Sequence, residues 1–324
     1  MISLARDILR VVFRHRRGRA ACPACAAAAA RVCDGCMRPH LARVARYVVA
    51  GAPIHFALPA FPAKSPNPRK VLGARADMAE EIGLRHLQSM GDEIACAYAP
   101  GARITICSDG HVFADLVGVA DADVMAYAAD VRSIIETLGL RSLDAFSLAD
   151  VFPDGSFEDQ RTRLVAGFAE PLDRVRARLH QTAHGRALYN GIHRFLFEDA
   201  VTRATGSRNR IRRETGERTY EVIQRSQAWG RAVSRFFPDA VRLSIHPQPA
   251  GAFKIGIRLG AAEDAWLTPW HAVALEAAGR FRLVHRADAE AMGATLIERV
   301  GRASHYLLSS TLEKSIPDHH LEVA

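Results

Sequence analysis

A stretch rich in proline carries the first group of side chains that could bind a ligand or take part in catalysis. Residues 59–68 hold four prolines, which stiffen the backbone. Two ammonium groups and two hydrogen-bonding side chains on such a loop suit a phosphate or a carboxylate. The alternative is an ordinary surface turn. The candidates, the first catalytic and the others substrate-binding, are Lys64, Ser65, Asn67 and Lys70.

A second group follows the apolar residues 103–107, which predict a buried strand. A histidine flanked by carboxylates can act as a general acid or base near neutral pH. The alternative is a hydrogen-bonded turn, because Asp-Gly is a favoured turn pair. The candidates, the first for substrate binding and the others for catalysis, are Ser108, Asp109, His111 and Asp115.

A third group lies in the last third of the chain. Alternation along residues 241–246 places three polar side chains on one strand face, opposite Leu243 and Ile245. Solvent exposure would explain each of them singly. Arginine is the default cation here, so a lysine in such a segment indicates a chemical choice. The candidates, His246 for catalysis and the rest for substrate binding, are Arg242, Ser244, His246, Lys254, Thr268, Trp270 and His271.

Two CxxC pairs near the N-terminus have the spacing of a structural zinc site. On one continuous helix the outer two cysteines would lie roughly 21 Å apart, too far to share an ion. Pro23 and Gly35 favour breaks that would let the pairs fold together. Reduced buried thiols are the alternative. The four cysteines are Cys22, Cys25, Cys33 and Cys36.

These groups need elements that position them. A capping box of Asp77 and Glu80 predicts the start of a helix, and Gly139 the end of another. Further helical patterns cover residues 161–201, 220–237 and 287–300. Strands are expected at residues 54–58, 103–107, 241–246, 253–259, 273–275 and 281–283.

This order of elements predicts the α/β class. We expect a single compact domain with a mixed sheet flanked by helices: a Rossmann-like core plus antiparallel C-terminal strands. The expected divisions are a helical, cysteine-containing segment (1–45), the α/β domain (46–305) and a polar tail (306–324). Open α/β sheets bind ligands at the carboxyl ends of their strands.

Composition limits the partners. The formal net charge is +8, and nearly all the positively charged side chains are arginines. The arginine cluster at residues 203–218 lacks aromatic residues that could stack on bases. No apolar stretch is long enough to span a bilayer, and the N-terminal order of apolar and then basic residues reverses that of a secretory signal. We therefore expect a cytoplasmic protein with small-molecule substrates, no nucleic acid and no membrane partner. Its oligomeric state is unknown.

Common cofactor signatures are missing. The sequence contains no Gly-rich dinucleotide fingerprint, no Walker sequence and no GxSxG elbow. We expect no cofactor, and chemistry based on acid–base catalysis or on an amine. The alternatives are a phosphosugar aldolase or transferase that uses a lysine imine, and a zinc-stapled nucleic-acid-binding protein.

Seven motifs occur in an order that resembles the isocyanide synthases, the pyoverdine/dityrosine biosynthesis proteins. The resemblance covers roughly residues 40–285. The motifs are LPAFPAKSPN (58–67), DMAEE (77–81), YAPGA (98–102), SDGHVFAD (108–115), RSQAW (225–229), RLSIHP (242–247) and TPWH (268–271).

The resemblance implies an isonitrile synthase that converts the α-amino group of tyrosine or tryptophan, with ribulose 5-phosphate as carbon donor and no redox cofactor. It implies a phosphosugar cradle built from Lys64, Lys70, Arg242 and Lys254, and proton transfer by Asp109, His111, Asp115, His246 and His271. Trp270 would stack on the aromatic substrate. The chain departs from the family at Ala76, where proline is usual, and at His111, where arginine is frequent.

Overall fold

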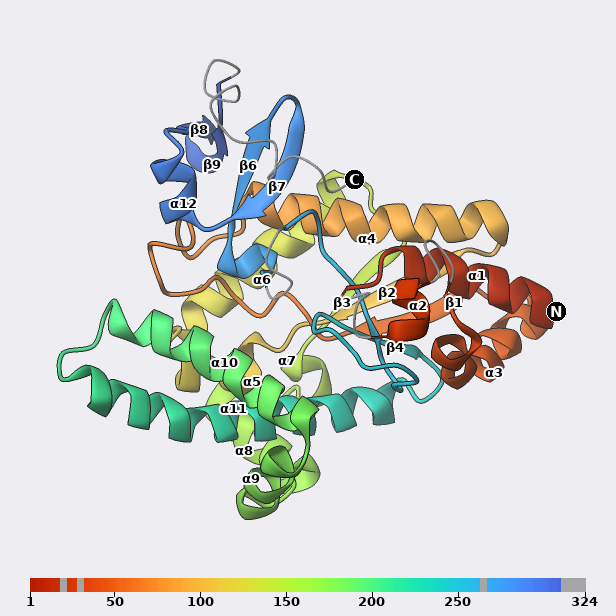
Figure 1. Cartoon of the computed structure of the whole chain (residues 1–324), viewed down its shortest axis with the longest axis horizontal. Helices are drawn as coiled ribbons and strands as arrows, with labels where there is room; N and C mark the ends of the chain where they lie inside the picture. Colours follow the sequence, from red (N-terminus) through yellow and green to blue (C-terminus); the bar gives the residue numbers. More distant parts are fainter. Residues whose placement is uncertain (18–21, 28–31, 263–266, 310–324) are drawn as a thin grey trace.

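The computed structural model describes residues 1–17, 22–27, 32–262 and 267–309. Its described strands form two sheets (Figure 1). The first sheet is parallel throughout and has the strand order 3-2-1-4-5 of a Rossmann core. Its strands, in spatial order, are β3 (Leu143–Phe146), β2 (Ala102–Cys107), β1 (Ile54–Leu58), β4 (Val241–Ser244) and β5 (Ile255–Gly256).

Helices cover both faces of this sheet, as its apolar strands require. In β1, Ile54, Phe56 and Leu58 point into one core cluster and Ala57 points into another. The first cluster packs against α1 (Ile2–Arg14), α3 (Asp34–Ala50), α4 (Met78–Ala97) and α6 (Asp121–Thr137). The second packs against α7 (Leu148–Val151), α8 (Phe157–Phe168) and α11 (Arg208–Phe236).

The remaining helices lie at the ends of strands or on the surface. The helices α10 and α11 run side by side as a hairpin along one side of the molecule (Figure 1). The bounds of the remaining helices are α2 (Pro23–Ala27), α5 (Gly110–Val117), α9 (Leu172–Gln181), α10 (Ala183–Val201) and α12 (Arg286–Ala291).

The second sheet lies beyond the first turn of α4 (Figure 1). Its strand order is β7-β6-β9-β8, with antiparallel outer pairs and a parallel central pair. The strands are β6 (Val273–Ala277), β7 (Arg280–Val284), β8 (Thr295–Arg299) and β9 (Arg302–Leu307).

The predicted α/β class and the helix caps are confirmed. Ala79 N–H donates to Asp77 and Asp77 N–H donates to Glu80, which is the expected capping box. Gly139 follows α6 with a φ of 60°. Two details were wrong. The strands near residues 241 and 255 were expected in the antiparallel set, but β4 pairs parallel with β1 and β5 pairs parallel with β4.

The predicted helix over residues 287–300 was also wrong. The helix α12 stops at Ala291, and Gly293 takes a φ of 73° that redirects the chain. Residues 295–299 then form β8, which turns at Val300 and Gly301 and pairs with β9. Both turn residues have positive φ, as in the tight turns favoured in β-hairpins.

The N-terminal helices are part of the main core. Ile8, Leu9 and Val12 of α1 are fully buried in the cluster that contains Phe56 and Leu84. At the other end, β9 reaches Leu307, and most of the predicted tail lies outside the described residues. Among the described helices, none combines the length and apolarity needed to cross a bilayer.

Candidate active site

The carboxyl ends of β1, β2 and β4 bring the three predicted groups to one edge of the first sheet. The strand order reverses between β1 and β4, and ligands of open α/β sheets bind at such a switch point. We refer to the following residues at this edge as the strand-end site: Lys64, Asp109, Arg242, His246, Lys254 and His271.

Lys64 is fully engaged by the protein. Its Nζ lies 2.9 Å from Asp77 Oδ2 and 2.7 Å from Glu80 Oε2, and it donates to the Pro269 carbonyl at 3.2 Å. Burial would lower the pKa of Lys64, but the two carboxylates overcome this effect and raise it. The ammonium is therefore held charged and ties the loop after β1 to the first turn of α4. In this arrangement it has neither a free amine for an imine nor a free face for a phosphate.

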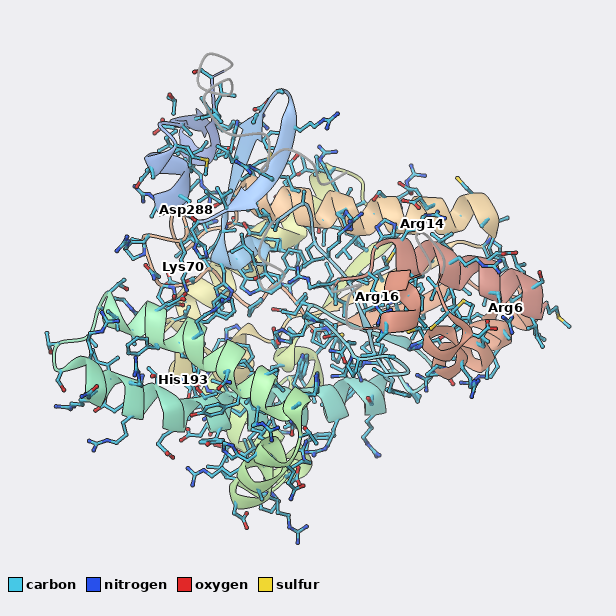
Figure 2. All side chains as sticks on the ribbon, viewed as in Figure 1. Arg6, Arg14, Arg16, Lys70, His193 and Asp288 are labelled. Atoms are coloured by element: carbon cyan, nitrogen blue, oxygen red, sulfur yellow. The ribbon has the colours of Figure 1, made fainter. Side chains whose placement is uncertain are left out.

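Ser65, Asn67 and Lys70 dock the same loop onto α10. Ser65 Oγ donates to Asp199 Oδ2 at 2.9 Å, and Asn67 Nδ2 donates to Asp199 Oδ1 at 3.4 Å. Lys70 Nζ lies 2.7 Å from Glu198 Oε2 and 2.8 Å from Asp199 Oδ1. Figure 2 shows Lys70 between this loop and α10. These side chains hold the helical hairpin over the strand ends.

Asp109 is the carboxyl group at this edge that lacks a counter-charge. It follows β2 at the N-cap of α5, and its Oδ1 is buried without a hydrogen-bond donor among the described residues. Burial raises the pKa of Asp109 to about 7. A Cβ on Gly110 would overlap the Pro62 carbonyl oxygen, so glycine lets Asp109 approach the loop after β1. Such a carboxyl is suited to move protons near neutral pH.

The neighbouring polar residues of that segment have partners. Ser108 Oγ donates to the Phe61 carbonyl at 3.0 Å. His111 stacks on Phe157 and lies 3.3 Å from Asp121. Asp115 accepts two hydrogen bonds from Arg225 on α11. Asp115 therefore serves packing between α5 and α11, whereas Ser108 and His111 line a cavity.

That cavity lies at the ends of β2 and β3 and has a volume of about 300 Å³. Its lining is mainly apolar, with Ser108 and His111 among the few polar groups. This volume and polarity suit an aromatic side chain. The apolar lining includes Phe61, Met125, Phe146 and Phe157.

Two cations, the buried Arg242 and the partly buried Lys254, face α11 on the other side of the switch point. Arg242 is 2 % exposed, because the strand face predicted to carry it packs under α11. Its Nη1 donates to the Gly230 carbonyl at 2.9 Å, while its Nε and Nη2 lack partners among the described residues. Lys254 forms no ion pair or hydrogen bond within the same residues, and a Cβ on Gly230 would lie 3.9 Å from its Nζ and 4.0 Å from Nη2 of Arg242.

Burial, and then the charge of Arg242, lower the pKa of Lys254 to about 8. Two neighbouring cations with free donors and no carboxylate partner among the described residues form a site for an anion. Ser244, on the same strand face, accepts from His246 N–H at 3.1 Å and from Gln248 Nε2 at 3.2 Å, and so shapes the chain that follows β4.

Two histidines at this edge are neutral. Burial, and then the charges of Arg17 and Lys254, lower the pKa of His246 to about 3. Burial also lowers the pKa of His271 to about 4, and its ring stacks on Phe195 of α10 with 4.8 Å between centroids. With pKa values this low, the two imidazoles are weak bases, and a neutral imidazole offers one hydrogen-bond donor and one acceptor.

Thr268 and Trp270 make contacts within the protein near His271. Thr268 Oγ1 lies 3.2 Å from His271 Nδ1 and orients that ring. Trp270 is 3 % exposed and packs on Phe61 in the core, so the ring is not a surface on which a substrate could stack. This placement differs from the stacking role that the resemblance implied.

The sequence did not predict that several further residues contact the strand-end site. Asp199 is a carboxylate in an ordinary helical run, and only the fold places it against Lys70. Asp77 and Glu80 were predicted as helix caps, and their second role as partners of Lys64 depends on contacts across the loop. Gly230 lies within the long helix α11, and nothing in the sequence predicted that its carbonyl accepts a hydrogen bond from Arg242.

The four N-terminal cysteines also come together. Their sulfur atoms all lie within 4.8 Å of one another. The two CxxC pairs are therefore close enough to share an ion, as the breaks expected at Pro23 and Gly35 would allow.

Comparisons with known proteins agree with this geometry. The family described as pyoverdine/dityrosine biosynthesis protein matches residues 44–297. The L-tryptophan isonitrile synthase AmbI2 of Fischerella ambigua is 44% identical over 304 residues, 94% of this chain and 91% of that one. An L-tyrosine isonitrile synthase of Pseudomonas aeruginosa is 47% identical over 276 residues, 83% of each chain. The crystal structure of PvcA from Pseudomonas aeruginosa has a TM-score of 0.87 and 43% identity, and the match covers 94% of this chain and 99% of that chain.

Proposed function

Because the chain belongs to the pyoverdine/dityrosine biosynthesis protein family, we propose that it is an isonitrile synthase acting on an aromatic L-amino acid, tyrosine or tryptophan. Relatives named for each of these substrates match most of the chain. The proposal also rests on one observation in the strand-end site. Arg242 keeps two buried donor atoms without partners, the buried carboxyl group of Asp109 lacks a counter-charge at the same sheet edge, and Ser108, next to Asp109, lines an apolar cavity.

The cavity supports an aromatic substrate. Its phenylalanine side chains would contact a phenol or an indole ring, while the amino group of the substrate would lie toward Asp109. Because relatives at similar identity use tyrosine and tryptophan, the choice between the two depends on side chains that line this cavity.

We further propose ribulose 5-phosphate as the carbon donor. Arg242 and Lys254 would bind its phosphate, since their free donors lack a protein partner in the described residues. Condensation of an amine with a ketone releases water and requires proton transfers. Asp109 would supply and accept these protons, and the neutral His246 and His271 would each offer the substrate hydrogen-bonding groups. Lys64 would act as a positioning residue.

The test is direct. The purified protein is incubated with ribulose 5-phosphate and either tyrosine or tryptophan, and the product is examined by mass and by its isonitrile infrared band. Ribulose 5-phosphate labelled uniformly with ¹³C should add one labelled carbon to the product. An unlabelled isonitrile would refute the donor alone. Active, folded protein that gave no isonitrile with these or the remaining amino acids would refute the activity.

A further inference from the structure

The cysteine cluster, Cys22, Cys25, Cys33 and Cys36, has the geometry of a metal site. Cys22 Sγ lies 3.7 Å from Cys33 Sγ, and Cys25 Sγ lies 3.8 Å from Cys36 Sγ. Four sulfurs at about 2.3 Å from a central zinc ion lie about 3.8 Å from one another in a regular tetrahedron. The separations across the two CxxC pairs match that value.

Other states of four cysteines fit less well. All the described cysteines are free thiols, and a disulfide would need sulfurs at about 2.05 Å. In a four-iron cluster each cysteine binds a different iron, which spreads the sulfurs further apart than one shared ion does. A single tetrahedral ion therefore accounts best for the distances.

The groups around the sulfurs are hydrogen-bond donors. Arg16 Nη1 points at Cys25 Sγ from 3.6 Å and at Cys36 Sγ from 3.4 Å. The backbone N–H of Cys33 donates to Cys25 Sγ at 3.4 Å. Donors directed at sulfur suit thiolates that bind a metal, and such outer contacts are typical of zinc sites. Figure 2 shows Arg16 beside α2.

We propose that Cys22, Cys25, Cys33 and Cys36 bind one structural Zn²⁺. Four thiolates complete the coordination of zinc, so this ion has no open position for a substrate. The ion would join Cys22 and Cys25 to Cys33 and Cys36 and so hold the two CxxC pairs together.

The site would also fix the segment that carries Lys254. Arg16 Nη2 donates to the Gln248 carbonyl at 3.3 Å, and Arg17 N–H donates to the Gly256 carbonyl at 2.9 Å. The residues between these two anchors include Lys254. This consequence rests on the proposed function, in which Lys254 binds the ketose phosphate. Loss of zinc should therefore raise the KM for ribulose 5-phosphate more than it lowers kcat.

Metal content tests the site without reference to activity. The full-length protein, purified without chelating resins, should contain one zinc per chain by elemental mass spectrometry. Replacement of zinc by Co²⁺ should give the absorption of a tetrahedral thiolate complex. The double variant Cys25→Ser/Cys36→Ser should lose the metal, whereas Cys96→Ser, which removes an exposed cysteine on α4, should keep it.

Thiol titration of the unaltered protein provides a measurement that does not depend on a variant that folds. In the native holoprotein the four clustered thiols should be unreactive, and they should become reactive once a chelator removes the ion. Folded protein without zinc, iron in place of zinc, or zinc retained by the double variant would each overturn the proposal. If zinc is found but no isonitrile forms, the metal site stands and only the proposed function fails.

Discussion

At the scale of single residues, Asp109 is the group whose replacement should separate chemistry from folding. The change Asp109→Asn keeps the shape of the side chain but removes the proton that the proposed reaction needs. General acid–base catalysis contributes about 10²- to 10⁴-fold, so kcat should fall by that range. The measurement is the initial rate of isonitrile formation at saturating substrates. Asp123→Asn, at an exposed position on α6, is the matched control and should keep the normal rate.

The same variant should change how stability depends on pH. Because burial raises the pKa of Asp109 from 3.8 to about 7, folding disfavours the ionised carboxylate. The penalty is absent below about pH 4, grows as the pH rises, and is complete above pH 7, where it is on the order of 4 kcal/mol.

Asp109→Asn should therefore be more stable than the unaltered protein at pH 8, and the difference should shrink at pH 5. Urea unfolding at the two pH values measures this effect. A difference in stability that stays constant with pH would show that folding does not raise the pKa of Asp109.

The pH dependence of activity should distinguish two roles of Lys254, phosphate binding and imine formation. Its pKa of about 8 means that the ammonium is lost as the pH rises above 8. If the ammonium binds phosphate, kcat/KM for ribulose 5-phosphate should fall on this alkaline side. Lys254→Arg should keep activity and remove the fall, because guanidinium stays charged. Lys254→Gln should raise KM about 10- to 100-fold.

An imine role for Lys254 would give the opposite results. The neutral amine would be the reactive form, so activity would rise toward pH 8, and Lys254→Arg would be inactive. Borohydride with ribulose 5-phosphate would then label a peptide that contains Lys254.

At the scale of elements, Lys64 joins the loop after β1 to the start of α4. Removing the ammonium in Lys64→Met would leave Asp77 and Glu80 buried without their counter-charge. Breaking a buried ion pair in this way typically costs about 3 to 5 kcal/mol. Denaturant unfolding should show this loss. Glu80→Gln in the same chain should restore part of the stability, and strictly additive losses would show that the pair is not coupled.

A helix or strand could be predicted from the sequence when the contacts that stabilise it join residues close in sequence. The helix α4 was predicted from its capping box because Asp77 and Glu80 are three residues apart. The strand β8 was missed because it is stabilised by pairing with β9, while the same residues include good helix formers. Only the φ of 73° at Gly293 ends the helix locally.

The candidate site shows the same division. Alternation along β4 correctly placed Arg242 and Ser244 on one face, but it could not show that α11 covers that face. The alternative explanation, solvent exposure, is therefore wrong for Arg242. Its partner Gly230 and the docking of Lys70 on Asp199 join segments distant in sequence, and no spacing rule reveals them.

At the scale of the whole molecule, the N-terminal helices and the Rossmann sheet share one apolar core. Ile8 and Leu9 of α1 lie in the same cluster as Phe56 of β1 and Leu84 of α4. Arg17 and Arg258 add backbone hydrogen bonds between the N-terminal segment and the last strand of the sheet. Residues 1–45, predicted as a separate segment, should therefore unfold together with the body.

The variant Ile8→Ala tests this cooperativity. Truncating a fully buried isoleucine typically costs about 2 to 5 kcal/mol. The three tryptophans of the chain all lie within residues 229–270, so their fluorescence reports on the body and not on α1. If the protein folds as one unit, Ile8→Ala should lower the midpoint of the fluorescence transition and of the circular dichroism transition by the same amount. Ile2→Ala, at an exposed position of the same helix, should change neither. A fluorescence midpoint that Ile8→Ala leaves unchanged would mean that α1 unfolds separately, and the cysteine cluster could then not hold the Lys254 segment through Arg16.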